Sequence, residues 1–329
     1  MSSLEEDVCL RLGLLTTAQI NDALLEGAAR TELADVVAVA SRDLERAEAY
    51  ARERSIPRAH GSYEALFGDA DVDAVYIALP NALHVDWAIR ALEAGKHVLC
   101  EKPLSRNPRE VERAFDAAER AGRVLMEAFM YRHQPQVKRM KELVDEGAIG
   151  RLRLVRSHFS FTLTREDDVR WDPGLGGGSL LDVGSYCVNV SRLLAGEPEV
   201  VYAEQVLAAS GVDTRFAATF RFPGDALGHF DCGFDGPRRH EVEAVGSSGR
   251  LVLSPAFAVD EGVLQIDLGD DVTQVDLPAT HRYHLEVENF ARAVLGEEPP
   301  LLDRRESVGQ ARALDALLRS AETGLPASP

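Results

Sequence analysis

The chain has 329 residues, of which 45% are hydrophobic and 27% charged, and its formal net charge is −18. This length suggests about two domains, and the composition excludes a disordered or collagen-like chain. The negative charge argues against nucleic-acid and membrane partners, because it repels phosphate groups. No apolar run approaches the ~20 residues of a membrane span, and the acidic start Met1–Asp7 predicts no secretory signal. We therefore expect a cytoplasmic protein.

The four cysteines are widely spaced along the chain and form no CxxC pair; they are Cys9, Cys100, Cys187 and Cys232. Such spacing predicts reduced, buried thiols and neither a disulfide framework nor a metal site.

The first 130 residues alternate short apolar runs with helical patterns. The expected strands are Val8–Leu15, Val36–Ala40, Val72–Ala78, His97–Cys100 and Val124–Phe129. The expected helices are Gln19–Ala29, Asp43–Arg54, Ser62–Phe67, Val85–Ala94 and Pro108–Arg120. Strands that are apolar throughout and alternate with helices indicate a parallel sheet covered on both faces. We predict an α/β protein whose residues 1–130 form a doubly wound, dinucleotide-binding Rossmann domain.

From residue 131 the pattern changes to long strands with fewer helices. The expected helices are Pro135–Glu146, Asp182–Leu194, Tyr283–Leu295 and Glu306–Thr323, and a long strand covers Arg151–Leu163. Between Glu199 and Leu277 the residues alternate as in strands, with a hairpin turn at Gly246–Gly249. We predict that residues 131–329 form an α+β domain for substrate binding and oligomerisation. Its open, mostly antiparallel sheet would have helices on one face, and solvent or another subunit on the other.

The turn after the first strand departs from the glycine pattern of dinucleotide-binding folds. Thr16, Ala18 and Asn21 stand where glycines let the backbone approach a pyrophosphate. Small residues at the first two positions still permit a close approach, and the start of the helix offers N–H groups to phosphate. An ordinary strand-to-helix turn is the alternative. The candidate pyrophosphate contacts are Thr16, Thr17, Ala18, Gln19 and Ile20.

Ser41 and Arg42 end the second strand, where an acidic residue would hold a ribose 2′-hydroxyl. A hydroxyl beside a guanidinium suits a phosphate instead. This favours NADP over NAD. The alternative is that Arg42 lies on the surface and Asp43 only caps the next helix.

Two further segments follow strands at the edge where ligands bind in such sheets. The first is Leu79–His84, in which Leu79, Pro80, Asn81 and His84 are candidate cofactor contacts. The second is Glu101-Lys102-Pro103, which is notable because the chain has only four lysines. A surface Glu-Lys pair is the alternative, and the sequence leaves open whether the proline peptide bond is cis.

A second cluster lies in the other half of the chain. Three glycines, Gly176–Gly178, precede Asp182 and Tyr186, which share one face of a helix because they are four residues apart. The same spacing also suits a glycine loop followed by a half-buried tyrosine.

Taken together, these motifs resemble the glucose–fructose oxidoreductase/inositol dehydrogenase (Gfo/Idh/MocA) family over nearly the whole chain. Leu99–Pro103, Met126–Arg132 and Gly176–Tyr186 are most similar to the branch of NADP-dependent aldose (xylose) 1-dehydrogenases and dimeric dihydrodiol dehydrogenases. Tyr186 favours this branch, because inositol dehydrogenases carry histidine there. The turn at Thr16–Asn21 departs from the family pattern.

The resemblance implies a nicotinamide that lies across the carboxyl ends of the first-domain strands and faces the second sheet. Glu101 would contact the nicotinamide ribose, and Lys102, Asp182 and Tyr186 would carry the chemistry. Oxidation of an alcohol needs a group that accepts the hydroxyl proton. Tyr186 is the favoured group, since Lys102 would lower its pKa toward neutrality. Alternatively, Lys102 carries the proton and Tyr186 orients the substrate oxygen.

Asp182 would hold a second sugar hydroxyl and keep Lys102 charged. The pocket for a sugar or polyol substrate would be lined by aromatic faces and hydrogen-bond donors. The candidates are Arg132, His133, Phe159, Arg170 and Trp171.

Three other functions stay open. A ketosugar reductase would act on anhydrofructose or on nucleotide-linked sugars, and an enzyme for nucleotide-linked sugars would need a further basic patch for the diphosphate. A redox-neutral, NAD-dependent glycosidase would have a histidine-rich glycine loop, which this chain lacks. A non-catalytic, cofactor-sensing subunit would not need Lys102, Asp182 and Tyr186. The family architecture leads us to expect a homodimer or homotetramer.

Overall fold

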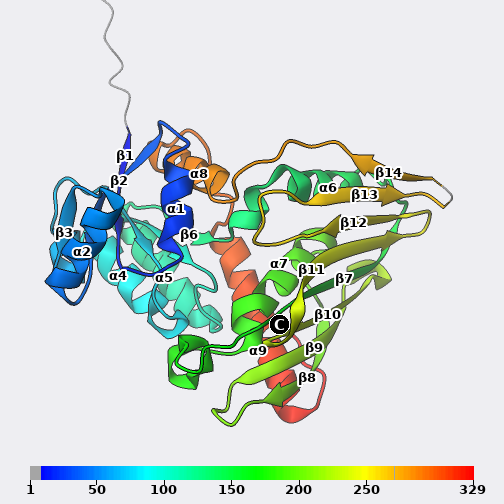
Figure 1. Ribbon diagram of the computed structural model, residues 1–329. Helices are drawn as coiled ribbons and strands as arrows, with labels where there is room; N and C mark the ends of the chain where they lie inside the picture. Colours follow the sequence, from blue (N-terminus) through cyan, green and yellow to red (C-terminus); the bar gives the residue numbers. More distant parts are fainter. Residues whose placement is uncertain (1–8, 270) are drawn as a thin grey trace, which may run out of the picture.

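The computed structural model describes residues 9–269 and 271–329, and two sheets organise this part of the chain (Figure 1). The strands of the first sheet are β1 (Leu10–Leu14), β2 (Ala34–Ala40), β3 (Arg58–His60), β4 (Ala74–Ile77), β5 (His97–Glu101) and β6 (Leu125–Ala128). They are all parallel, in the order β3-β2-β1-β4-β5-β6. Of the strand predicted from Val8, the first residue lies outside the described residues. β3 was not predicted, because its three residues carry no apolar run.

Helices cover both faces of this sheet, as predicted; they are α1 (Asn21–Ala28), α2 (Leu44–Arg54), α3 (Tyr63–Phe67), α4 (His84–Glu93) and α5 (Pro108–Ala121). Every residue of β4 and β6 is buried. Asn107 caps α5 by accepting the N–H of Arg109, and Pro108 occupies the first turn. The strand order reverses between β1 and β4, and ligands bind at the carboxyl ends of strands at such a point.

The second sheet consists of β7 (Leu152–Thr162), β8 (Val200–Leu207), β9 (Asp213–Arg221), β10 (Leu227–Gly233), β11 (Asp235–Gly246), β12 (Arg250–Ser254), β13 (Val263–Asp267) and β14 (Val272–Val275). Their order is β14-β13-β12-β11-β7-β10-β9-β8, and only β7 and β10 pair in parallel within the described residues. The predicted hairpin at Gly246–Gly249 joins β11 to β12. A Cβ atom on Gly246 would lie 2.0 Å from the carbonyl oxygen of Ile149, so this turn needs glycine.

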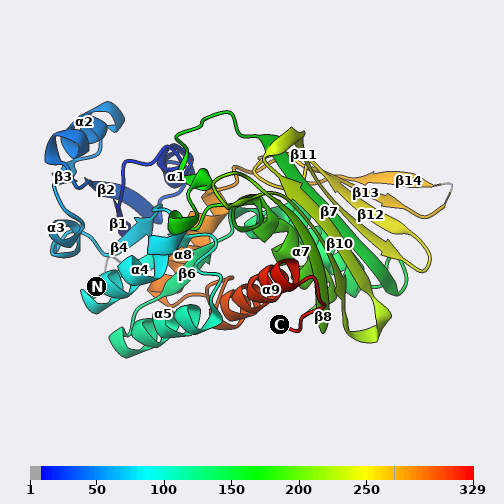
Figure 2. The same ribbon diagram turned by 90° about the horizontal axis from the view of Figure 1, so that it is seen from below.

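One face of the second sheet packs against helices, as Figure 2 shows. These helices are α6 (Pro135–Asp145), α7 (Ser185–Ala195) and α9 (Arg304–Thr323). Val155, Phe216 and Phe230 point toward them and are buried. The helix predicted near Asp182–Leu194 consists of a π-helical turn, η5 (Leu180–Gly184), followed by α7. Asp182 and Tyr186 therefore do not lie on one continuous α-helix.

Short 3₁₀ turns connect several of these elements: η1 (Asn81–Leu83), η2 (Met130–His133), η3 (Val169–Trp171), η4 (Pro173–Leu175) and η6 (Pro223–Asp225).

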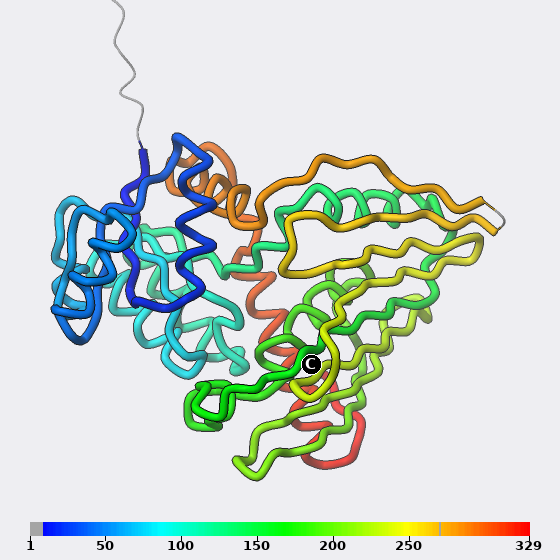
Figure 3. Tube along the Cα trace, in the orientation of Figure 1, coloured from blue at the N-terminus to red at the C-terminus, as the bar shows by residue number. Residues whose placement is uncertain are grey.

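The last part of the chain returns to the first sheet. α8 (His284–Leu295) packs against α1, where a Cβ atom on Gly27 would lie 2.8 Å from the backbone of Tyr283 (Figure 3). The Arg304 guanidinium at the start of α9 forms ion pairs with Glu112, Asp116 and Glu119 of α5. A division at residue 130 stays a prediction, and these contacts show that the C-terminal helices hold both halves together.

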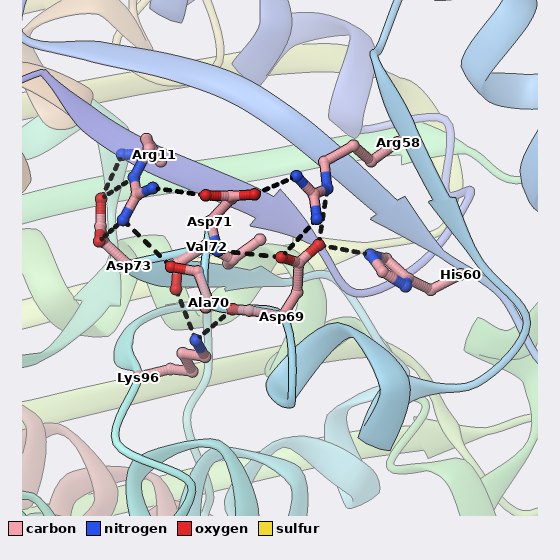
Figure 4. Close-up of polar contacts among 9 residues, drawn as sticks. All are labelled: Arg11, Arg58, His60, Asp69, Ala70, Asp71, Val72, Asp73 and Lys96. Carbon is pink, nitrogen blue, oxygen red and sulfur yellow. Dashed lines mark hydrogen bonds and ion pairs between the residues drawn. The ribbon is translucent and has the colours of Figure 1, made fainter.

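An ionic network joins the amino-terminal ends of the first-domain strands, on the edge away from the strands' carboxyl ends (Figure 4). Arg11 of β1 donates to both carboxylate oxygens of Asp73. The buried Lys96 ammonium donates to the carbonyl oxygens of Asp69 and Val72, at 2.7 and 2.6 Å. The carboxylate of Asp69 also pairs with Arg58. The network ties the loop before β4 to β1, β3 and the start of β5.

None of the helices in residues 9–269 and 271–329 is both long and apolar enough to cross a bilayer. The four cysteines are free thiols, as predicted, and three of them are buried.

Candidate active site

A cleft of about 1120 Å³ lies at the carboxyl ends of the first-domain strands, and residues from both halves of the chain line it. All of the predicted cofactor contacts line it, namely Thr16, Thr17, Ala18, Gln19, Ile20, Ser41, Arg42, Leu79, Pro80, Asn81, His84, Glu101 and Lys102. Phe159, Arg170, Asp182 and Tyr186 of the predicted substrate set line the same cleft. The fold thus brings together residues that are up to 170 positions apart in the sequence.

Side chains shape the turn in which glycines were expected. The Asn21 side-chain amide donates to the carbonyl oxygen of Thr16 at 2.6 Å. The Thr16 hydroxyl donates to the carbonyl oxygen of Ala78 and accepts the N–H of Ala18. α1 begins at Asn21, two residues after the predicted start. These contacts hold a compact turn in the wall of the cleft.

Two arginines face the cleft at the end of β2. Arg42 and Arg46 both line it beside the largely buried Ser41, and neither has a carboxylate within ion-pair distance among the described residues. Asp43 turns away to cap α2, where it accepts the N–H groups of Glu45 and Arg46. Two guanidiniums without carboxylate partners in so acidic a chain suit an anionic group such as a phosphate. The sequence reasoning missed Arg46, although its position four residues after Arg42 was a usable signal.

Lys102 and Asp182 meet in the cleft. The Lys102 ammonium lies 3.1 Å from Asp182 Oδ1 and 2.7 Å from the carbonyl oxygen of the same residue. Asp182 Oδ2 accepts the Nε–H of Arg170 at 2.7 Å. Burial alone would raise the pKa of Asp182, but the two cations outweigh it and hold this pKa below its usual range. Asp182 is therefore held as a carboxylate, and its contacts fix the position of the Lys102 side chain.

Tyr186 lies next to this pair, with its ring in a group of aromatic side chains. The Lys102 ammonium is 4.8 Å from the ring centroid, so it faces the ring and not the hydroxyl group. The hydroxyl group faces Met130 Sδ at 3.5 Å. Burial, together with the charges of Glu101 and Asp182, raises the pKa of Tyr186 well above its usual value. The prediction that Lys102 lowers this pKa toward neutrality is therefore wrong for the free protein.

Glu101 forms the floor of the cleft beside Lys102. Its carboxylate accepts the hydroxyl group of Tyr76 and the N–H of Lys102. Burial raises the pKa of Glu101, and Lys102 opposes this effect only in part. The Lys102–Pro103 peptide bond is cis.

The glycine-rich loop approaches the first domain closely. The Asn81 side-chain amide donates to the carbonyl oxygen of Gly176 at 2.8 Å, across the cleft. A Cβ atom on Gly177 would lie 2.3 Å from the carbonyl oxygen of Arg170. A side chain at Gly177 would therefore prevent this close packing of backbone against backbone.

His84 contributes to the cleft wall but is fully buried, with both ring nitrogens facing backbone carbonyl oxygens. Burial lowers the pKa of His84, so the ring is neutral. Its polar atoms are already engaged with the protein backbone.

Three of the predicted substrate residues lie outside the cleft lining. The buried Arg132 guanidinium contacts Asn189 Oδ1 at 3.0 Å and Glu306 Oε2 at 3.2 Å, and so joins η2 to α7 and α9. His133 is also buried, which lowers its pKa to about 3. Trp171 packs edge-on against Phe234. Arg132 and His133 are buried in the core, and Trp171 is partly buried against it, so packing with elements unknown from the sequence keeps all three out of the cleft lining.

The cleft also has lining residues that no sequence motif signalled, among them Tyr63, Phe161, Arg238 and Tyr283. They come from separate elements, and only the tertiary structure places them together. Within the described ranges, no group of three or more His, Cys, Asp or Glu side chains could hold a metal ion.

Comparisons with known proteins agree with this geometry. Residues 13–129 match the model of the oxidoreductase family with an NAD-binding Rossmann fold, and residues 137–252 match the GFO/IDH/MocA C-terminal domain. The D-xylose 1-dehydrogenase (NADP(+)) 2 of Haloferax volcanii is 44% identical over 321 residues, 96% of this chain and 98% of that protein. The trans-1,2-dihydrobenzene-1,2-diol dehydrogenase of Oryctolagus cuniculus is 39% identical over 70% of each chain.

Among solved structures, the chain is similar to KijD10, a 3-ketoreductase from Actinomadura kijaniata in complex with NADP and TDP-benzene. The TM-score is 0.89 and the sequence identity 33%, with 95% of this chain and 98% of that chain covered. The family models match both halves of the chain, and the D-xylose 1-dehydrogenase covers nearly all of it. The chain therefore belongs to the GFO/IDH/MocA family of oxidoreductases.

Proposed function

We propose that the protein is an NADP-dependent dehydrogenase that transfers hydride between the nicotinamide and C1 of an aldose. The observation that carries this proposal is the single cleft in which Lys102, Asp182 and Tyr186 meet at one end and Arg42 and Arg46 lie at the other. The 44% identity to an NADP-dependent xylose 1-dehydrogenase over 96% of the chain supports the aldose as substrate class.

Bound NADP⁺ supplies the acceptor for the hydride, and the residues of this chain hold it and the sugar. Arg42 and Arg46 bind the phosphate on the adenosine ribose, and Ser41 donates a hydroxyl hydrogen bond to it. The turn at Thr16–Ile20 holds the pyrophosphate. Glu101 lies where the nicotinamide ribose would bind. The cleft fits a dinucleotide because the cationic end and the reaction centre lie on the same edge of one parallel sheet.

Tyr186 transfers the proton and Lys102 holds the substrate oxygen. Oxidation of an aldose to its lactone releases a hydride from C1 and a proton from the hydroxyl group. The free protein holds Tyr186 as the neutral phenol, so oxidation requires that the phenol first lose its proton to solvent. In the reverse direction the same phenol donates its proton to the carbonyl oxygen. Asp182 keeps Lys102 charged and accepts a hydrogen bond from a second hydroxyl group.

The charges at the substrate end favour a free sugar over a nucleotide-linked one. Arg165 and Arg282 line the cleft but pair with Asp167 and Asp260, at 3.5 and 3.0 Å. Arg238 alone among these arginines has no carboxylate partner within the described ranges. A diphosphate needs several free cations, whereas the hydroxyl groups of a free sugar do not.

The direct test is the formation of NADPH, measured by its absorbance, with a panel of aldoses, inositols and cyclic diols. We expect steady NADPH production with at least one aldose and little with NAD. The Lys102→Ala variant should bind NADP within about threefold of the wild type, and lose ~10²-fold or more in kcat, as general acid–base residues do. If the panel is silent while NADPH binds tightly, the ketosugar reductase is the better assignment, and reduction of keto sugars becomes the assay.

We further propose that the protein acts in the cytoplasm as a homodimer or homotetramer. Four free cysteines suit a reducing compartment. On β8, the exposed Val200, Tyr202 and Val206 alternate with the buried Val201 and Ala203, so they lie on the face of the sheet that no helix covers. Light scattering of the wild type and of Val206→Glu tests this interface, and we expect the substitution to lower the mass.

A further inference from the structure

The peptide group that joins Pro103 to Leu104 is held at both of its polar ends by buried side chains. Its carbonyl oxygen lies 2.9 Å from His84 Nδ1, and its N–H donates to Glu127 Oε1 at 2.8 Å. His84 is 0% exposed and begins α4, while Glu127 is 2% exposed and belongs to β6. Side chains from two separate elements thus hydrogen-bond to the same peptide group, which directly follows Lys102.

His84 also connects this loop to a second cleft-lining loop. Its Nε2 atom lies 2.8 Å from the carbonyl oxygen of Leu79, which follows β4. A neutral imidazole has one N–H, so it donates to one of the two carbonyl oxygens at a time. The ring fills the space between the loops and sets the separation of Leu79 and Pro103.

Burial of the Glu127 carboxyl group lowers the stability of the fold unless this group makes a specific contact. Oε1 accepts the N–H of Leu104, and Oε2 has no hydrogen bond of normal distance and angle among the described residues. Burial raises the pKa of Glu127, and Leu104 and the nearby Ser307 hydroxyl oppose this effect only in part. A protonated carboxyl group still accepts the N–H of Leu104 through its carbonyl oxygen. The contact therefore requires an acceptor at this position and not a negative charge, which a glutamine would also supply.

We propose that Glu127 and His84 are positioning residues for Lys102. By fixing the Pro103–Leu104 peptide group from two sides, they hold the Lys102 ammonium against Asp182 and over the ring of Tyr186. This inference rests on the proposed function in one respect, since it takes Lys102 to act on the substrate.

The first experiment compares Glu127→Gln with Glu127→Met, which is similar in size but has no oxygen acceptor. We expect Glu127→Met to lower kcat by ~10- to 100-fold, because catalysis is sensitive to misplacement of about 1 Å. The Kd for NADP should stay within about twofold, because no cofactor contact is removed, and Glu127→Gln should retain kcat within about threefold, since it keeps the acceptor. Equal kcat losses in both variants, or none in Glu127→Met, would overturn the proposal.

The second experiment separates positioning from general loss of packing. His84→Gln is compared with His97→Gln, in which the replaced ring accepts the N–H of Val124 at 2.9 Å near the amino end of β5. Both variants lose a partly or fully buried imidazole from the same sheet, so both should have a lower Tm. We expect only His84→Gln to lose kcat, by about tenfold or more, since a misplaced group affects the chemical step. A similar loss in His97→Gln contradicts the positioning role.

The third measurement does not depend on activity. Hydrogen exchange of the Leu104 amide reports whether its bond to Glu127 persists. We expect exchange at Leu104 to be faster in Glu127→Met and unchanged in Glu127→Gln. Unchanged exchange in both variants excludes the contact, whatever the substrate is. The wild type could oxidise no sugar while the Leu104 amide exchanges in the two variants as expected. The proposed function would then fail, but the hydrogen bond from Leu104 to Glu127 would be confirmed.

Discussion

At the scale of single residues, the reaction centre depends on how charge is balanced around Asp182. This carboxylate faces the Lys102 ammonium and the Arg170 guanidinium, both within hydrogen-bond distance. Within the described residues, the buried Tyr186 hydroxyl faces the Met130 sulfur atom and no charged group. The protein thus holds Lys102 in place beside a phenol whose pKa is raised. In the proposed reaction, the protonation state of Tyr186 decides whether it accepts or donates the proton.

This arrangement predicts opposite pH dependences for the two directions. The pKa of Tyr186 is raised, so the phenolate becomes available only as the pH rises. We expect kcat/KM for aldose oxidation to increase through the alkaline range, and that for lactone reduction to decrease. The measurement is the pH profile in both directions. In the Tyr186→Phe variant, the residual kcat/KM should no longer depend on pH in this way. A pH dependence that persists in this variant would show that another group transfers the proton.

Cofactor choice is also decided by individual side chains. Arg46 lines the cleft without a carboxylate partner among the described residues. Replacing it by alanine removes a charge-assisted contact worth about 1.5–3 kcal/mol, or roughly 10- to 100-fold in NADP affinity. We expect this loss in Kd for NADP and little change for NAD, measured by fluorescence titration. Arg52→Ala, in an exposed pair with Glu48 on the same helix, is the matched control. An equal loss for both cofactors would exclude a phosphate contact.

At the scale of elements, the two edges of the first sheet have different tasks. The carboxyl ends of its strands supply Ser41, Asn81 and Glu101 to the cleft. The amino ends hold the ionic network of Figure 4, which fixes the loop that precedes β4. One edge therefore secures the sheet while the other binds ligands.

This network predicts a loss of stability in acid. Arg11 hydrogen-bonds to Asp73, and this lowers the pKa of Asp73 below its ordinary value of 3.8. A lowered folded-state pKa adds stability above 3.8, and this contribution disappears as the pH falls through the folded-state pKa. We expect Asp73→Asn to lower Tm at neutral pH and to approach the wild type in acid, by circular dichroism. Asp315→Asn, in an exposed pair with Arg319, should change Tm much less at either pH.

At the scale of the whole molecule, the charge of −18 sets the response to salt. Most ion pairs lie near the surface, where each contributes little to the free energy of unfolding. Salt therefore removes little stability by weakening them. The repulsion among excess carboxylates is a long-range effect that salt screens within about 10 Å at 0.1 M. We expect Tm to rise between low and molar NaCl, and to rise less in sucrose of equal osmolality. A falling Tm would mean that the ion pairs outweigh the net repulsion.

The sequence by itself determined the architecture of the first half, and it singled out Lys102, Asp182 and Tyr186, which the fold brings into one cleft. Continuous apolar runs have one stable arrangement, a parallel sheet covered on both faces, and strand-end motifs such as Glu101-Lys102-Pro103 then lie at its ligand-binding edge. Gly176–Tyr186 was identified as a second cluster because its residues are close together in the sequence, and their spacing is visible without knowledge of the fold. β3 and the π-helical turn at Asp182 were not predicted, because they depend on neighbouring elements.

Only the tertiary structure decided which side chains face the cleft. It also decided which ionisable groups there have shifted pKa values. Arg132 and Trp171 are close to site residues in sequence, yet Arg132 contacts Asn189 and Glu306 in the core and Trp171 packs against Phe234. His133 is buried as well. The pKa of Tyr186 depends on burial and on charges from three other elements, so proximity to Lys102 could not set it. The hold of His84 and Glu127 on one peptide group joins residues 43 positions apart. Such contacts depend on the distance in space, which the sequence does not state.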